Sequence, residues 1–268
     1  MGGALQGWDT PPAMVNGTLT ISSAYMGHGT FVAGVARCMA PHVMIYVADV
    51  FKIAGSALES HMVRKLTEAL GLDVDIFHLT IAATTRKDIH LIAFGAWLGR
   101  LHQSKGVVCV AAAGNNNSKR RCWPAAFPGV ISVGALATDW RSRAGFSNFG
   151  RWVDVYAPGT NLINAYTTGV YHCTVSPYRG TDRTFDGLAQ WSGTSFSTPI
   201  VTGLIAARMS RTGESASEAV ASLLGVARAQ AVPDAGPILL PCCGVAPRSE
   251  CCCDTHPHGC GERHVPRR

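Results

Sequence analysis

The chain has 268 residues, of which 47% are hydrophobic and 15% charged, and its formal net charge is +6. This length and apolar content suffice for one domain with a substantial core, and 29 glycines suit a tightly packed, turn-rich fold. The sequence contains no run of about 18 apolar residues, which argues against a membrane span. It also has no basic stripe interleaved with aromatic residues, so we expect no nucleic-acid partner.

Segments typical of strands and helices alternate along most of the chain. In the helix expected at 58–70, the inward-facing residues are Met62, Val63, Leu66, Ala69 and Leu70. The alternation predicts an α/β fold class, a three-layer, doubly wound and mostly parallel sheet. The expected strands lie at 43–51, 74–82, 107–112 and 130–135, and the expected helices at 58–70 and 89–104.

A glycine-rich turn, Gly193-Thr194-Ser195, precedes a segment that is typical of a buried helix. Apolar residues recur there at helical spacing from Ile200 to Met209, and Pro199 suits the first helical turn. Ser195 is therefore expected at or just before a helix N-terminus, where backbone N–H groups favour developing negative charge. A nucleophilic serine needs this environment, but a serine that merely caps the helix would show the same pattern.

Two further motifs add a base and an amide. Gly27-His28-Gly29-Thr30 places a histidine between glycines at the start of a small-residue helix. The apolar strand at 107–112 runs into Gly114-Asn115, so the Asn115 amide is displayed at a strand end. The other histidines, among them His78, His90 and His102, have no such setting, and we interpret them as structural or surface residues.

The order His28, Asn115, Ser195 and the three motifs around these residues resemble those of the subtilases, the subtilisin-like serine proteases (peptidase S8). The resemblance extends from about Gly27 to about Leu240 and includes framework segments at 127–135, 146–150 and 155–159. It implies a serine endopeptidase in which Ser195 forms the acyl-enzyme and His28 is the general base. The Asn115 side chain and the Ser195 backbone N–H would form the oxyanion hole.

The resemblance also implies polypeptide substrates, a monomer and catalysis without a cofactor. It leaves a structural calcium ion open, because the sequence does not place one. By the same reasoning we expect an N-terminal remnant of the catalytic domain at 1–26, the catalytic domain at 27–240 and a tail at 241–268.

The third member of the triad departs from the family pattern. Subtilases carry an aspartate in an Asp-Thr/Ser-Gly turn after the first core strand, well before the histidine. Here Asp9-Thr10 is the nearest candidate, but Pro11 and Pro12 follow it, and Met1–Trp8 lacks the valine-isoleucine run of a central strand. Three explanations stay open: an N-terminus truncated before the chain begins, a genuine pseudoprotease, and Asp9 as a displaced partner of His28.

Other departures concern the substrate edge and a basic loop. Ile81-Ala82-Ala83 replaces the glycines that pair with substrate backbone in the family, which predicts a narrower specificity pocket or a shifted peptide. Lys119-Arg120-Arg121 follows Asn115 closely, and from the sequence we interpret this run as a solvated loop. An α/β-hydrolase is disfavoured, because the turn around Ser195 lacks the second glycine of the nucleophile elbow and the histidine precedes the serine.

The cysteines fall into two groups. Cys38 and Cys109 lie in apolar contexts and should pack as small hydrophobic residues, whereas Cys122 and Cys173 lie in loops and could pair. The tail from Pro241 matches no zinc-finger spacing, and we expect it to be disordered and to bind no metal. It holds Cys242, Cys243, Cys251, Cys252, Cys253 and Cys260.

The ends of the chain leave localisation and activity open. Met1–Tyr25 has neither a basic n-region nor a continuous apolar h-region, so no signal peptide is expected as written, and a truncated N-terminus would leave secretion open. The function expected is serine endopeptidase. The alternative is a catalytically impaired subtilase fold, or fragment, with a binding role.

Overall fold

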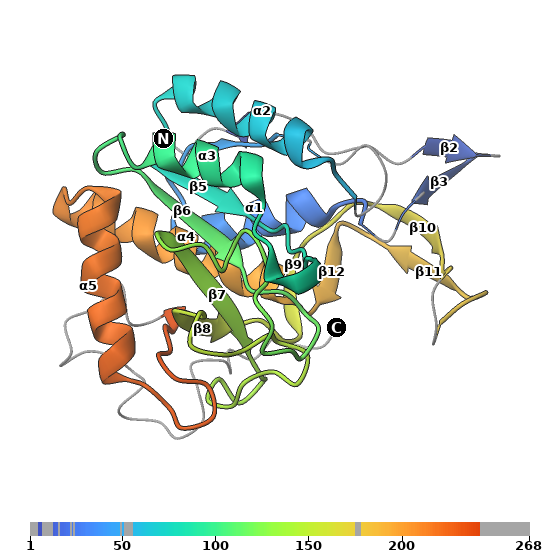
Figure 1. The fold of residues 1–268 in the computed structure, drawn as a ribbon. Coiled ribbons are helices and arrows are strands. Elements are labelled where there is room, and N and C mark those ends of the chain that lie inside the picture. Colours follow the sequence, from blue (N-terminus) through green and yellow to red (C-terminus); the bar gives the residue numbers. More distant parts are fainter. Residues whose placement is uncertain are drawn as a thin grey trace.

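The computed structural model of the chain (Figure 1) describes residues 5–6, 13–15, 17–21, 23, 25–48, 50, 56–174 and 178–241. Its centre is a parallel sheet with the strand order β5-β6-β7-β8. Long apolar runs bury these strands on both faces, as parallel sheets require. The four strands are β5 (Ile76–Leu79), β6 (Val108–Ala112), β7 (Val130–Leu136) and β8 (Val155–Pro158).

Helices cover both faces of this sheet. Alternate residues of β6 point to opposite sides, so Val110 joins one core cluster and Cys109 the other. The first cluster contains the helices α1 (His28–Met39), α4 (Thr194–Thr212) and α5 (Ala216–Ala229). The second contains α2 (Glu59–Ala69) and α3 (Ile92–Leu101), which lie together above the sheet in Figure 1. The expected three-layer α/β architecture is confirmed.

The remaining strands form three small sheets at the periphery. One of them, β11-β10-β3-β2, projects from the body of the molecule in Figure 1. The small sheets consist of β1 (Leu5–Gln6) with β4 (Ile45–Tyr46), of β9 (Leu162–Ala165) with β12 (Leu188–Trp191), and of β2 (Ala13–Val15), β3 (Thr18–Ile21), β10 (Gly169–His172) and β11 (Asp182–Phe185). Short 3-10 helices cover Leu70–Leu72 (η1) and Arg86–Asp88 (η2).

One strand expectation for the N-terminal half is wrong. The strand expected over 43–51 is limited in the described residues to Ile45–Tyr46, which pairs with Leu5–Gln6. Met1–Trp8 was expected to hold no central strand, and the strand described there, Leu5–Gln6, pairs in parallel with β4 in a two-stranded sheet separate from the central one. The helix expected at 58–70 is confirmed as α2, with Met62 and Leu66 buried.

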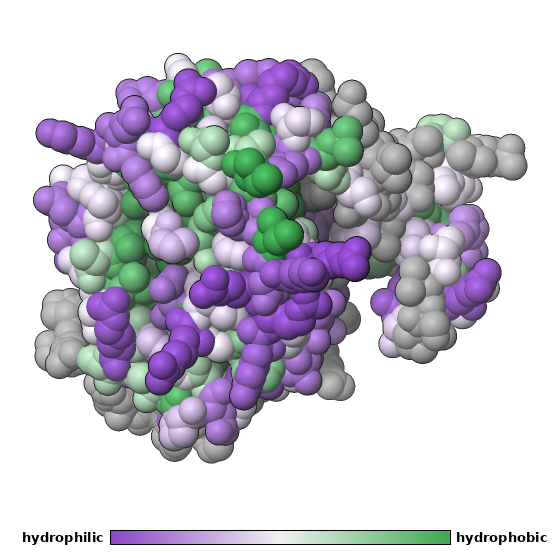
Figure 2. Space-filling model, viewed as in Figure 1, coloured by the Kyte–Doolittle hydropathy of each residue, from purple (hydrophilic) through white to green (hydrophobic). Residues whose placement is uncertain are grey.

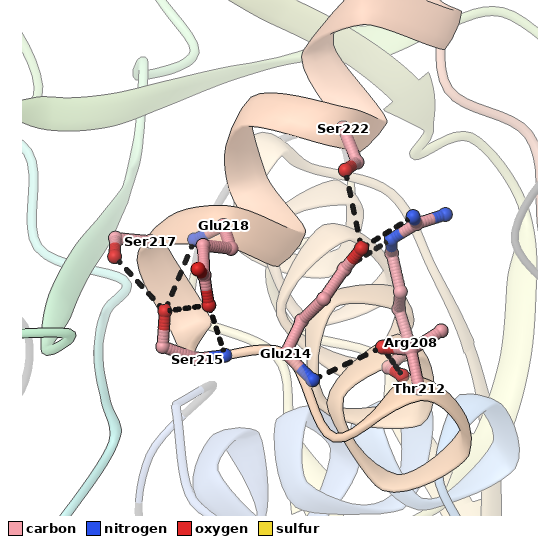
Figure 3. Close-up of polar contacts among 7 residues, drawn as sticks. All are labelled: Arg208, Thr212, Glu214, Ser215, Ser217, Glu218 and Ser222. Carbon is pink, nitrogen blue, oxygen red and sulfur yellow. Dashed lines mark hydrogen bonds and ion pairs between the residues drawn. The ribbon is translucent and has the colours of Figure 1, made fainter.

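Hydrogen bonds join the end of α4 to the start of α5, as drawn in Figure 3. Ser215 and Glu218 form a capping box at the start of α5: Glu218 N–H donates to Ser215 Oγ, and Ser215 N–H donates to Glu218 Oε2. Arg208 of α4 donates two hydrogen bonds to Glu214 in the connecting turn. These contacts fix the direction in which α5 leaves α4.

Candidate active site

Ser195 is the second residue of α4 and is partly exposed. The residue at the N-cap position is Gly193, and Ser195 lies inside the helix, so the interpretation of Ser195 as a capping serine is wrong. Pro199 lies in the second helical turn and not in the first, because the helix already begins at Thr194. Since proline has no N–H, Pro199 cannot donate to the Ser195 carbonyl one turn earlier.

The Asn115 side chain is fastened to the start of the same helix. Its Oδ1 accepts hydrogen bonds from Thr194 N and Thr194 Oγ1, both at 2.9 Å, and Gly114 N donates to Thr194 Oγ1 at 3.1 Å. Because both bonds to the Asn115 side chain end on its oxygen, the amide nitrogen remains the donor for a ligand. A Cβ on Gly193 would lie 3.5 Å from Asn115 Nδ2, so the nitrogen faces the turn that leads to Ser195. The expected display of the amide at a strand end is confirmed.

Asn148 holds the Asn115 turn in place, and sequence reasoning missed it. Its buried Nδ2 donates to Ala113 O at 2.8 Å, and its Oδ1 accepts from Asn116 N and Ser118 N at 3.0 and 3.1 Å. A buried amide must find partners of this kind, because an unpaired one costs about 1–3 kcal/mol. The only signal in the sequence is an asparagine between two phenylalanines in the framework segment at 146–150.

His28 begins α1, as expected from the glycines around it. Gly27 has φ of 81°, and a Cβ there would lie 2.8 Å from the Tyr166 ring, so the position requires glycine. The His28 ring lies 5.5 Å from Trp191 and 5.4 Å from Phe196, measured between ring centroids. Because Phe196 directly follows Ser195, the structure brings the base and the nucleophile predicted from sequence into one neighbourhood. Asp9 lies outside the described residues.

A second histidine, His78, lies on β5, close enough to His28 to be affected by its charge. His78 Nδ1 is 2.8 Å from Thr202 Oγ1, and Thr202 Oγ1 donates to Thr198 O, so the network assigns the His78 proton to Nδ1. Burial, and then the charge of His28, lowers the pKa of His78 to about 4. His78 is therefore neutral at pH 7 and suits a structural role. His90 and His102 are exposed.

The four cysteines in the described part of the chain are all free thiols. Cys122 and Cys173 are free thiols, so the pairing considered from sequence is wrong, and Cys38 is exposed and not packed as expected. Cys109 is buried, as expected. Burial raises the pKa of the Cys122 thiol to about 11, which keeps it protonated at neutral pH although its Sγ lies close to Gly114.

Three further observations concern the described residues outside this neighbourhood. Within that part of the chain, no cluster of three or more histidine, cysteine, aspartate or glutamate side chains is suited to a metal ion. None of the described helices is long and apolar enough to cross a membrane. A groove of about 570 Å³ lies on the projecting sheet, lined by residues such as Leu19, Val170 and Phe185, and contains none of the predicted site residues.

Several proteins of known sequence are similar to this chain. The chain is 32% identical over 194 residues to a thermophilic serine proteinase of Bacillus sp. (strain AK1), and the alignment covers 67% of this chain and 41% of the relative. It is 28% identical over 198 residues to subtilisin DY of Bacillus licheniformis, with 69% of this chain and 64% of the relative covered. The chain thus spans less than two thirds of either relative.

Solved structures with the same fold include the prenylagaramide maturation protease PagA and a cold-adapted subtilisin-like serine proteinase. The TM-scores are 0.62 and 0.64, each at 24% identity; the alignments cover 80% and 87% of this chain, and 76% and 85% of those chains. At this identity the likeness concerns the fold alone. The model of the subtilase family matches residues 12–235. The chain belongs to the subtilase family.

Proposed function

We propose that the protein is a serine endopeptidase that cleaves polypeptides through an acyl-enzyme on Ser195. The observation that carries this proposal is the pair of hydrogen bonds from Thr194 to Asn115 Oδ1. They turn the amide nitrogen of Asn115 toward the helix start that bears Ser195. Donors held in this way before the substrate arrives stabilise the oxyanion without reorganisation during the reaction.

The reaction follows from the chemistry of the three side chains. His28 takes the proton from Ser195 Oγ as the oxygen attacks the peptide carbonyl, and returns it to the leaving amine. The developing oxyanion is held by Asn115 Nδ2 and the Ser195 N–H, one of the α4 amides that have no partner within the helix. Water then hydrolyses the acyl-enzyme by the same groups.

The relatives support the reaction class. The two relatives compared above are named as a serine proteinase and a subtilisin. In this chain, the oxyanion donor Asn115 follows the fully buried strand β6, and the nucleophile stands on α4, which packs against that strand. A serine peptidase needs no metal or organic cofactor for these steps.

A second candidate function is a subtilase fold with impaired catalysis that binds polypeptides. It is favoured by the sequence after Asp9, where two prolines replace the glycine turn that carries the aspartate in the family. Without an oriented histidine, a serine triad loses about 10⁴ in rate, although the oxyanion hole and the cleft still act.

A serine-directed phosphonate probe tests the proposal. We expect it to label Ser195, and Ser195→Ala should abolish labelling. Ser197→Ala is the matched control, because Ser197 lies on the same helix but is fully buried and has no role in the proposed reaction. Labelling that survives Ser195→Ala, or that Ser197→Ala removes, contradicts the assignment.

A further inference from the structure

Two short basic segments lie beside the proposed active site. The first follows β5 and contains Arg86 and Lys87 in η2, and the second follows Asn115 and contains Lys119, Arg120 and Arg121. All five side chains are exposed. Residues 84–90 and 116–123 hold one carboxylate, Asp88, against these five cations. We call these five residues the basic rim.

Contacts between the two segments make the basic rim a defined surface. Arg120 Nη2 donates to Thr85 O at 2.8 Å and lies 3.4 Å from Asp88 Oδ1. Ala83 and Trp123 exchange two backbone hydrogen bonds of 2.8 Å, which join the chain after β5 to the chain after Asn115. Segments about 35 residues apart in sequence are thereby held side by side. The solvated loop expected from the sequence is thus docked against a second basic segment.

The charges of the basic rim are mostly uncompensated. The single carboxylate, Asp88, is already paired with Arg120. Within the described part of the chain, the ion pairs include none of the four other rim cations, Arg86, Lys87, Lys119 and Arg121. The surface over η2 is correspondingly strongly hydrophilic in Figure 2. Clustered cations at the mouth of a site attract ligands of opposite charge and raise their local concentration.

The basic rim lies at the edge of the sheet where the proposed chemistry takes place. Parallel strands end at one common edge, and β5 leads to the first basic segment as β6 leads to Asn115 and the second. A peptide bound with its carbonyl oxygen at Asn115 Nδ2 must therefore lie close to both segments. Acidic side chains near the scissile bond would come within reach of several cations.

We propose that the basic rim selects acidic polypeptide segments as substrates of the Ser195 site. This inference rests on the proposed function and names its substrate class. An acidic peptide is favoured over a nucleic acid because the cations flank a site that acts on peptide carbonyls. Residues 84–90 and 116–123 carry no exposed Phe, Tyr or Trp side chain on which bases could stack.

Matched peptide pairs test the selection. Each pair differs in having Asp or Glu, or else Asn or Gln, within about three residues of the cleaved bond, the span over which cations at the mouth of the site can act. We expect kcat/KM to favour the acidic peptide by about tenfold at low salt and by less than about threefold in roughly 0.5 M NaCl, because salt screens exposed charges. Equal rates for the two peptides, or a preference that salt leaves unchanged, would overturn the inference.

Reversing the charge of residues in the basic rim tests whether the rim causes the preference for acidic peptides. Arg86→Glu/Lys87→Glu/Arg121→Glu should abolish or invert the preference, and it leaves the Arg120 contacts in place. The control, Arg100→Glu/Lys105→Glu/Arg228→Glu, changes the net charge equally at exposed positions outside the rim and should retain the preference. Loss of the preference in both variants would show that net charge, and not the rim, is responsible.

A binding assay separates this inference from the proposed function. Fluorescence anisotropy of the same peptides on the Ser195→Ala protein should show the same order of affinity, whatever the rate of catalysis. Absent phosphonate labelling would refute the proposed function while the binding order still tests the rim. A single-stranded oligonucleotide that binds more tightly than the acidic peptide, and displaces it, would overturn the inference in favour of a nucleic-acid surface.

Discussion

Every residue of β6, β7 and β8 is buried, whereas β4 has two residues, of which Ile45 is half-buried and Tyr46 exposed. The first group leads to Asn115 and packs against α4, which bears Ser195, and β4 lies in the N-terminal part that supplies His28. Ser195 and Asn115, the proposed nucleophile and oxyanion donor, therefore stand on a deeply packed part of the described structure. His28, the proposed base, begins α1, which packs against α4 in the same core cluster, but the strand β4 that follows α1 has only two residues.

The contacts described for Asn115 include hydrogen bonds, whereas those described for His28 are contacts between rings. Asn115 is joined to Thr194 by hydrogen bonds that span 79 residues of sequence, and hydrogen bonds have strict geometry. The ring contacts of His28 with Trp191 and Phe196 tolerate a range of orientations. The comparison shows that hydrogen bonds of the fold itself fix the Asn115 side chain, the proposed oxyanion donor.

The largest change in activity is therefore expected when Asn115, which the fold holds in place, is substituted. Asn115→Ala should lower kcat about 10²–10³-fold with little change in KM, because the donor acts on the transition state. That magnitude is the one established for the oxyanion-hole asparagine of a subtilisin, and it is carried over to this related chain. Steady-state kinetics on a chromogenic peptide measure both constants, and an effect confined to KM would contradict the role.

Asn115→Asp distinguishes two roles of Asn115: holding Thr194 through Oδ1, and donating a hydrogen bond from Nδ2 to the oxyanion. The aspartate keeps an oxygen that can accept from Thr194 N and Oγ1, but it lacks the Nδ2 donor and adds a negative charge beside the oxyanion. We expect kcat to fall at least as far as in Asn115→Ala, while the melting temperature stays closer to that of the unmodified chain. If Asn115→Asp retained most activity, Asn115 would act mainly by holding Thr194.

Asn148→Ala tests how much the Asn148 side chain stabilises the turn that carries Asn115. The change leaves the buried Ala113 carbonyl and the Asn116 and Ser118 amides without their partner, and we expect a loss of about 3 kcal/mol in the free energy of unfolding. Denaturant unfolding measures it. Asn116→Ala is the control, because it removes an exposed side chain from the same turn but keeps the backbone N–H that Asn148 binds. Equal losses of unfolding free energy in the two variants would mean that the hydrogen bonds of the Asn148 side chain do not contribute to stability as proposed.

The same contrast explains what the sequence could predict. His28, Asn115 and Ser195 were predicted as site residues because each lies in a short glycine-marked motif, and the helical period located α2 and α3. Asn148 was missed because its partners lie 30 to 35 residues away, and no local pattern records such a pairing. The apolar run at 43–51 predicted a long strand, but strand length depends on a partner, and β1 pairs with two residues.

A smaller effect is expected from His78, which joins β5 to α4 through Thr202. Its pKa is lowered to about 4 by burial and by His28, so the folded chain keeps the imidazole neutral while the unfolded chain protonates below pH 6.5. Stability is therefore present above pH 6.5 and is lost as the pH falls toward 4, by about 2 kcal/mol between roughly pH 7 and pH 5.

Urea unfolding at the two pH values measures this loss. His78→Gln, which cannot titrate, should remove most of the difference in unfolding free energy between the two pH values. His102→Gln, at an exposed histidine, should leave the difference nearly unchanged. A pH dependence that persists in His78→Gln would place the titrating group elsewhere.

The smallest effect is expected at Asp9. In subtilases the aspartate that orients the histidine stands in an Asp-Thr/Ser-Gly turn, whereas Pro11 and Pro12 follow Asp9-Thr10 in this sequence. We therefore expect Asp9→Ala to change the rate of Ser195 phosphonate labelling less than about threefold, where loss of a working triad aspartate costs about 10⁴ in rate. The labelling rate is the better measure, because it detects a weakly activated serine. A fall approaching about 10⁴ would identify Asp9 as the partner of His28, and the N-terminal part would then be as closely organised around the site as β6 and α4 are.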